Sequence, residues 1–95
     1  MLIIRRLLWD AWNVAHIARH AVTPEEVEEV CQGRPWTSQT YKERIRVIGP
    51  TRAGRMLTVI LAPQADIGVY YTVTARPASR KERRAYREWI GDAER

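Results

Sequence analysis

The residues best suited to chemistry lie where an expected strand meets an expected basic helix near the C-terminus. Arg76 ends the strand, and Ser79 and Glu82 have the spacing of a capping box, which predicts that a helix begins after Ser79. Arg80 and Lys81 then fall in the first helical turn, where cations oppose the helix dipole. Cations in this position indicate a bound anion, and phosphate is the natural candidate.

Two histidines, His16 and His20, lie one turn apart on another expected helix. A pair with this spacing can chelate zinc, but the sequence offers no convincing third ligand, so we expect neither a metal nor another cofactor. Because imidazole titrates near neutral pH, proton transfer is the more reasonable chemistry. The alternative is that each histidine simply lies on a polar or half-buried helix face.

The chain lacks a glycine-rich phosphate loop, a nucleophile elbow and a carboxylate cluster for Mg²⁺. If it cleaves phosphodiesters, we expect the RNA 2′-hydroxyl to supply the nucleophile. The protein would then position the bond, move protons and stabilise the developing negative charge. Arginine, tyrosine and histidine side chains suffice for these tasks.

Length and charge restrict the partners of the chain. Its 95 residues predict a single domain, residues 1–95, and its formal net charge of +5 favours an acidic partner, either nucleic acid or an acidic protein. All the basic residues except Lys42 and Lys81 are arginines, whose planar forks grip phosphate. The codon bias of a GC-rich genome would explain the same composition equally well.

The single cysteine, Cys31, excludes an internal disulfide and favours a reduced, cytoplasmic compartment. Arg5 and Arg6 interrupt the apolar N-terminal run, which is too short for a membrane span and lacks a signal-peptide cleavage pattern. We therefore expect a protein without membrane contacts.

Periodicity and capping residues predict an α+β domain with the element order β-α-α-β-β-β-α, in which helices pack an antiparallel sheet. The expected strands span residues 2–9, 44–48, 55–62 and 69–76. The expected helices begin after Asp10, Thr23 and Ser79, each of which is a suitable N-cap. Residues 34–43 are expected to be irregular. The nearly continuous apolar run of residues 55–62 predicts a central strand covered on both faces.

Alternation along two of these strands predicts a sheet face rich in polar groups. Towards the core we expect one set of the last strand: Val69, Tyr71, Val73 and Ala75. Away from the core we expect its other set, together with two arginines of the strand 44–48: Tyr70, Thr72, Thr74, Arg76, Arg44 and Arg46. Arginines, hydroxyls and an aromatic ring on one face suit RNA, although an ordinary solvated sheet face carries the same pattern.

Four stretches carry a family resemblance, in the same order along the chain: residues 9–13 (Trp-Asp-x-x-Asn), 17–26, 47–59 and 74–86. The last is the most specific, with the sequence Thr-Ala-Arg-Pro-Ala-Ser-Arg-Lys-Glu-Arg-Arg-Ala-Tyr. Together they resemble the BrnT family of bacterial type II toxins, which have the RelE-like ribonuclease fold.

The resemblance implies an mRNA interferase-like endoribonuclease that inhibits translation in the bacterial cytoplasm and is neutralised by a DNA-binding antitoxin protein. By position, Arg76 would stabilise the scissile phosphate, and Tyr86 and His20 would be the catalytic candidates for proton transfer. Trp9 would help to form the site. We expect further RNA contacts from a histidine and several arginines: His16, Arg44, Arg46, Arg80, Arg83 and Arg84.

The chain departs from the family pattern at four positions. Trp12 and Arg19 stand where the family has lysines, Ala21 stands where it has a glycine, and Pro77 stands where a basic residue is often found. A lost lysine would weaken phosphate binding or catalysis more easily than it would change the fold. The alternative function is therefore a toxin-like module that binds RNA or protein without cleaving.

Overall fold

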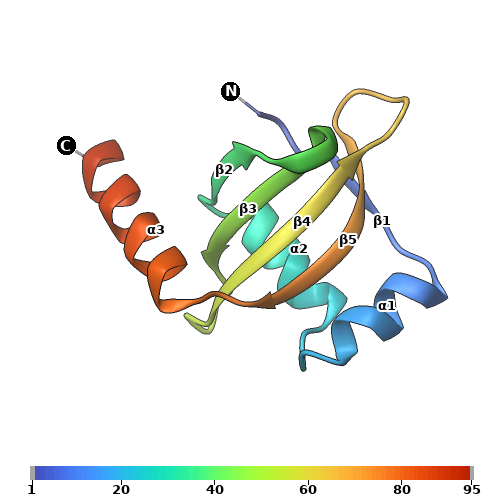
Figure 1. Cartoon of the computed structure of the whole chain (residues 1–95), viewed down its shortest axis with the longest axis horizontal. Coiled ribbons are helices and arrows are strands. Elements are labelled where there is room, and N and C mark those ends of the chain that lie inside the picture. Colours follow the sequence, from blue (N-terminus) through green and yellow to red (C-terminus); the bar gives the residue numbers. More distant parts are fainter. Residues whose placement is uncertain (1, 95) are drawn as a thin grey trace.

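A five-stranded sheet and three α-helices make up the structure, a computed structural model that describes residues 2–94. The elements follow the chain in the order shown in Figure 1: β1 (Arg6–Leu8), α1 (Ala11–Ala18), α2 (Pro24–Gln32), β2 (Trp36–Gln39), a 3₁₀ turn η1 (Tyr41–Glu43), β3 (Ile45–Pro50), β4 (Met56–Pro63), β5 (Val69–Pro77) and α3 (Arg80–Ala93). The α+β class is thus confirmed. None of the helices in the described residues has the length and apolar composition needed to cross a bilayer.

The sheet is mixed, so the prediction of an antiparallel sheet is wrong. Its strand order is β1-β5-β4-β3-β2, and β1 runs parallel to β5 while the other neighbours are antiparallel. Each strand from β2 to β5 is joined to the next by a short connection, which imposes antiparallel pairing between the two. Most of the chain separates β1 from β5, so no turn dictates its direction.

Two element boundaries also differ from the prediction. Residues 34–43 are not irregular, because Trp36–Gln39 pairs with β3 as an edge strand and Tyr41–Glu43 forms the 3₁₀ turn. The polar sequence of this edge strand has no apolar alternation that would reveal it. The first strand is shorter than the expected residues 2–9, since only Arg6–Leu8 finds partners on β5.

All three expected helix starts are confirmed. At each start the N-cap side chain accepts a hydrogen bond from the backbone N–H of the residue three positions later. The side chain of that later residue accepts a hydrogen bond from the backbone N–H of the N-cap. The pairs are Asp10 with Asn13, Thr23 with Glu26, and Ser79 with Glu82. Three such boxes make the helix positions a local property of the sequence.

The core lies on the sheet face covered by α2, with α1 beside β5 (Figure 1). Its apolar side chains are almost all shielded from solvent: Leu7, Ile17, Val22, Val27, Val30, Val47, Leu57, Val59, Leu61, Tyr70 and Ala75. The strand β4 occupies the middle of the sheet, and Leu57, Thr58 and Val59 are all buried. The expected central strand is therefore confirmed.

A β-bulge in β5 overturns the predicted facing of its first half. Leu61 pairs with Thr72, and the adjacent Ile60 pairs with Thr74, so Val73 is an extra residue. The extra residue shifts the alternation by one position. Tyr70 and Thr72 are consequently buried on the core side, contrary to expectation.

Beyond the bulge the predicted facing of β5 holds. Ala75 is fully buried in the core, and Arg76 belongs to the opposite face of the sheet. Before the bulge, Tyr71 takes the outward position that was expected for Tyr70. The outer face, defined here as the face turned away from α2, therefore still carries an aromatic ring and an arginine on β5.

Candidate nucleic-acid interface

A row of side chains crosses the outer face at the C-terminal end of β5. Arg76 pairs with Thr58 on β4, which pairs with Ile48 on β3, which pairs with Trp36 on β2. Paired residues of neighbouring strands project from the same face, so these four side chains share it. The row leads from an arginine at one side to an indole at the other.

The guanidinium of Arg76 is held end-on by Glu82 in the first turn of α3. Its Nη1 donates to Oε1 at 2.7 Å, and its Nη2 donates to Oε2 at 2.9 Å. Nη1 also donates to the carbonyl oxygen of Pro77 at 3.3 Å. The fork is therefore fixed to the same helix start that the sequence singled out.

Arg76 and Glu82 each stabilise the charged form of the other. Hydrogen bonds from Arg76 lower the pKa of Glu82 to about 2, with further help from the Ser79 backbone N–H and against the effect of burial. The bond to Glu82 in turn raises the pKa of Arg76. Glu82 thus stays ionised at neutral pH and serves as an anchor rather than as a proton acceptor.

One edge of the Arg76 guanidinium is left open. Within residues 2–94, its Nε–H and the second N–H of Nη2 have no hydrogen-bond acceptor. The side chain is 43% exposed. These two N–H groups point the same way, which is the arrangement that binds two oxygens of one phosphate.

A hollow of about 340 Å³ lies between the outer face and the start of α3. It is lined by residues of β2, β3 and the start of α3: Trp36, Arg46, Ile48, Ser79, Lys81, Glu82 and Ala85. The guanidinium carbon of Arg46 lies 5.8 Å from the centroid of the Trp36 ring. The Nε atom of Arg46 is buried without a hydrogen-bond partner in the described residues.

The arginines of α3 and β3 have different environments. Arg80 and Arg84 are exposed on α3, whereas Arg83 is half-buried and donates to the carbonyl oxygen of Ala78 at 2.8 Å. Arg83 therefore supports the turn between β5 and α3. Arg44 is half-buried in extended backbone two residues before Arg46, so the alternation places both on the outer face.

Tyr86 fastens α3 to the segment before β2. Its hydroxyl donates to the carbonyl oxygen of Arg34 at 2.8 Å, and its ring lies 5.8 Å from that of Trp89. The residue is only 8% exposed, and burial raises the pKa of the hydroxyl. In this arrangement the hydroxyl is engaged with backbone rather than with Arg76.

His20 lies at the same end of the sheet as the β5–α3 turn. Its carbonyl oxygen accepts a hydrogen bond from the Arg55 side chain at 3.3 Å. Met56, the residue after Arg55, accepts a hydrogen bond at its carbonyl oxygen from the Ala78 N–H at 2.9 Å, and Ala78 lies in the β5–α3 turn. The imidazole itself is exposed. No hydrogen bond or ring contact joins Arg76, Tyr86 and His20 in the described part of the chain.

The remaining expected site residues lie on the other side of β5. Trp9 packs against the core, and its Nε1 donates to Glu28 on α2 at 3.0 Å. His16 stacks on Trp12 with ring centroids 4.8 Å apart. Trp9 therefore braces α1 and α2, while His16 lies on an aromatic surface of its own.

Sequence reasoning missed two residues of the interface. Trp36 lay in a segment expected to be irregular, although Trp and Thr together favour a strand. Glu82 was recognised only as a cap, because the pairing with Arg76 requires the turn at Pro77 that no local pattern describes. A cation and a capping-box glutamate six residues apart, across a strand–helix turn, are the signal that could have found it.

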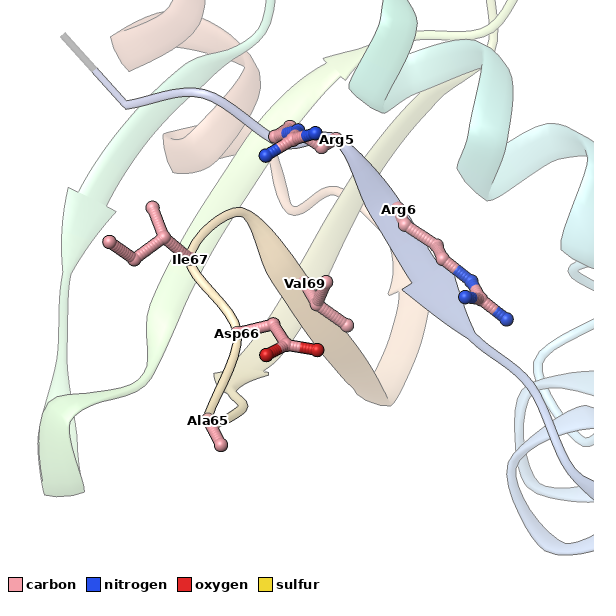
Figure 2. Close-up of a pocket in the computed structure, with 6 residues that line it drawn as sticks. All are labelled: Arg5, Arg6, Ala65, Asp66, Ile67 and Val69. Carbon is pink, nitrogen blue, oxygen red and sulfur yellow. The ribbon is translucent and has the colours of Figure 1, made fainter.

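Other sites in the molecule are less suited to phosphate. A hollow of about 740 Å³ lies between β1 and the β4–β5 loop, and Figure 2 shows its Arg5 and Arg6 side chains pointing away from one another, with Asp66 on the loop. Burial, followed by the nearby Glu28 charge, raises the pKa of Cys31 to about 12, so it is not a thiolate nucleophile. No cluster of three or more His, Cys, Asp or Glu side chains suited to a metal occurs within residues 2–94.

No family model matches the chain, and no curated protein is significantly similar to it.

Proposed function

We propose that this chain is a toxin-type endoribonuclease that binds RNA on its outer face and cleaves it without a metal ion. The observation that carries the proposal is the open edge of the half-exposed Arg76 guanidinium, which is bound by Glu82, a residue that lines the hollow. An arginine held rigidly by a carboxylate, with its remaining donors free, is preorganised for a phosphate.

The reaction requires little machinery because RNA carries its own nucleophile. The 2′-hydroxyl loses its proton and attacks the adjacent phosphorus, and the bond to the 5′-oxygen breaks as that oxygen gains a proton. The products are a 2′,3′-cyclic phosphate and a 5′-hydroxyl. Negative charge grows on the phosphoryl oxygens during the attack, and Arg76 is the group that would stabilise it.

Proton transfer falls to His20 in this proposal. It is exposed and lies at the same end of the sheet as Arg76, and an imidazole can act as both proton acceptor and proton donor. Tyr86 acts as a positioning residue that holds α3, and through Glu82 the guanidinium, in place.

The cations around the hollow supply affinity. Arg46, Lys81 and the exposed Arg80 and Arg84 lie on or next to the outer face, and they outnumber Glu82, the carboxylate that lines the hollow. Each phosphate that such a side chain neutralises adds to binding and to its dependence on salt.

The biological part of the proposal rests on the resemblance to BrnT toxins. It is that the enzyme acts on RNA in the bacterial cytoplasm, inhibits translation and is neutralised by a DNA-binding antitoxin. Expression of the chain alone should then arrest growth, and co-expression of a protein encoded beside it should restore growth. Normal growth with abundant folded protein contradicts this part.

The direct test is incubation of the purified protein with RNA in EDTA. We expect fragments that end in cyclic phosphate, and we expect Arg76→Ala to abolish them while leaving the far-ultraviolet circular dichroism unchanged. Intact RNA after incubation with folded wild-type protein overturns the assignment as a ribonuclease.

A second candidate is a module that binds RNA or protein on the same face without cleavage. It is favoured by the bonds of Tyr86 to backbone and by the low pKa of Glu82, because neither group beside the Arg76 turn is then free to move a proton. Salt-dependent retention of intact RNA in EDTA, weakened when Arg80 or Arg84 is neutralised, would identify this function. Binding to an acidic protein without any RNA binding would identify the protein-binding form.

A further inference from the structure

An exposed aromatic surface runs along α1, outside the interface described above. Trp12 is 59% exposed, and its ring stacks on His16 at a centroid distance of 4.8 Å with an interplanar angle of 8°. His20 follows one turn on, edge-to-face with His16 at 6.2 Å. We define Trp12, His16 and His20 as the aromatic row.

The buried side of α1 explains why this row faces solvent. Asn13 and Ile17 are fully buried, and the Asn13 amide donates to the carbonyl oxygens of Leu8 and Thr72 at 3.0 Å each. These bonds tie α1 to the edge of β5 and leave the neighbouring row of side chains outside. His16 supports one face of the Trp12 ring, and no other ring contact to Trp12 occurs in the described residues.

The row lies on a helix beside β5, the strand that carries Arg76. Asn13 lies at Thr72, and the loop after His20 is tied by Arg55 to the end of the sheet where Ala78 bonds Met56. Helix α1 therefore runs beside β5 toward Arg76. Trp12 is displaced from Arg76 by about four strand residues, or roughly 13 Å along β5.

The charge of this region suits a nucleic acid better than a protein. Residues 11–24 contain no aspartate or glutamate, and Arg19, the C-cap of α1, is exposed. The N-cap carboxylate, Asp10, accepts hydrogen bonds from the Tyr71 hydroxyl at 3.1 and 3.0 Å. An exposed, flat indole on a helix that carries no carboxylate attracts a base by stacking, and no acidic side chain of that helix repels the phosphates.

We propose that Trp12, backed by His16, is a stacking platform for one base of single-stranded RNA whose phosphate a few nucleotides away lies on Arg76. The proposal rests on the proposed RNA-binding function of the outer face and adds a subsite to it. At a stacked spacing of about 3.4 Å, roughly four nucleotides connect the two positions.

The test measures binding of 2′-O-methyl oligonucleotides, which lack the nucleophile and so remain intact. We expect Trp12→Ala to weaken an oligonucleotide of about eight nucleotides about tenfold, and to leave a dinucleotide unaffected because it cannot span both sites. Trp12→Tyr should restore most of the loss, since it returns a flat ring. An oligonucleotide with abasic linkers in place of bases should show no difference between wild type and Trp12→Ala.

The matched control is Tyr41→Ala. Tyr41 is 76% exposed with Lys42 over its ring, but it lies between β2 and β3, at the far edge of the sheet from α1. Its removal should not change binding of either oligonucleotide.

The outcomes separate this inference from the proposed function. If Arg76→Ala weakens both oligonucleotides and Trp12→Ala weakens neither, the stacking platform is wrong and the RNA-binding face stands. If folded wild-type protein binds no oligonucleotide at all, the proposed function is wrong and the platform with it. An equal loss for abasic and base-containing oligonucleotides in Trp12→Ala also overturns the platform.

Discussion

Two helix starts in this molecule use the same device for different ends. At α2, the capping-box residue Glu26 accepts the Thr23 backbone N–H at 3.1 Å and binds Arg55 through both carboxylate oxygens. At α3, Glu82 accepts the Ser79 N–H at 2.8 Å and also binds an arginine, Arg76, through both carboxylate oxygens. Arg55 uses one nitrogen, Nη1, for both oxygens, whereas Arg76 uses Nη1 for one and Nη2 for the other. Each glutamate therefore joins a helix cap to an arginine at the end of a strand: Arg55 directly precedes β4, and Arg76 is near the end of β5.

The two arginines differ in what else they bind. Arg55 also donates to the carbonyl oxygens of Ala21 at 2.7 Å and His20 at 3.3 Å, so it ties down the loop between α1 and α2. Arg76 has one weak backbone contact, to Pro77, and keeps an open edge. We call the pair Arg55–Glu26 the α2 clamp and the pair Arg76–Glu82 the α3 clamp. The α2 clamp holds a loop in place, and the α3 clamp leaves part of a cation exposed.

The flanking charges differ in the same sense. The first turn of α2 contains Glu25 and Glu26, which complement the helix dipole, whereas that of α3 contains Arg80 and Lys81 beside Glu82. The cations in the first turn of α3 slightly lower the stability of that helix, whereas the glutamates of α2 do not. This difference supports the proposal that Arg76 of the α3 clamp receives an external anion, and each prediction below tests one part of it.

The largest expected effect is on activity. Arg76→Ala should lower the rate of RNA cleavage by about a hundredfold or more, the usual loss when a group that stabilises transition-state charge is removed. Arg55→Ala is the matched variant, and its activity per folded molecule should stay close to wild type. Rates are measured with excess enzyme over labelled RNA in EDTA. Equal losses in both variants would mean that the two clamps do not differ in function.

The next effect is on stability, and it falls on the other clamp. Arg55→Ala removes hydrogen bonds to two carbonyl oxygens and to Glu26, so it should lower the free energy of unfolding by about 2 kcal/mol. The thermal midpoint should fall by roughly 10 °C for a domain of this size. Urea titrations followed by circular dichroism measure the change. An Arg55→Ala protein as stable as wild type would contradict the structural role of this clamp.

Glu82→Gln should give a smaller, pH-dependent loss of about 1 kcal/mol at neutral pH, because glutamine keeps the cap but not the charge. The folded pKa of Glu82 is about 2, below the ordinary value of 4.5, so its ionised form stabilises the fold above pH 4.5. That contribution is lost as the pH falls from 4.5 toward 2. The stability difference between wild type and variant should therefore be constant near neutral pH and close over that acidic range.

The same variant tests the role of Glu82 at the interface. Removal of its charge leaves Arg76 and Lys81 without a neighbouring anion, so RNA should bind more tightly even as the fold weakens. Glu26→Gln, the matched change at α2, should weaken the fold without tightening RNA binding. If Glu82→Gln lowers affinity instead, the carboxylate is needed mainly to orient the guanidinium.

The parts of the molecule that were predictable from sequence are those with local causes. Each of the three caps lies within four residues of the groups with which it forms hydrogen bonds. The continuous apolar sequence of β4 is enough to predict that the strand is buried. The bulge at Val73, the parallel direction of β1 and the edge strand Trp36–Gln39 depend on residues far away in the chain, so no window of sequence contains them.

The candidate site divides in the same way. Arg76 and the cations after Ser79 were expected because they stand next to a recognisable cap. The hydrogen bond of Tyr86 to Arg34 and the packing of Arg46 on Trp36 cross between elements and became visible only in the folded chain. Proton transfer by His20, with Tyr86 as a positioning residue, stays a prediction for the cleavage assay.

The smallest effect distinguishes the flanking charges. Replacing both Arg80 and Lys81 by alanine removes cations from the positive end of α3, so the fold should gain a few tenths of a kcal/mol. RNA binding should nevertheless weaken, and the slope of log affinity against log salt should become shallower by about 1.4 if each side chain neutralises one phosphate of a single strand. Glu25→Ala at α2 is the counterpart, and it should lower stability slightly and leave the salt slope unchanged. A gain in stability together with a loss of affinity is the signature of cations kept for a ligand, whereas an unchanged salt slope would show that Arg80 and Lys81 are ordinary surface residues.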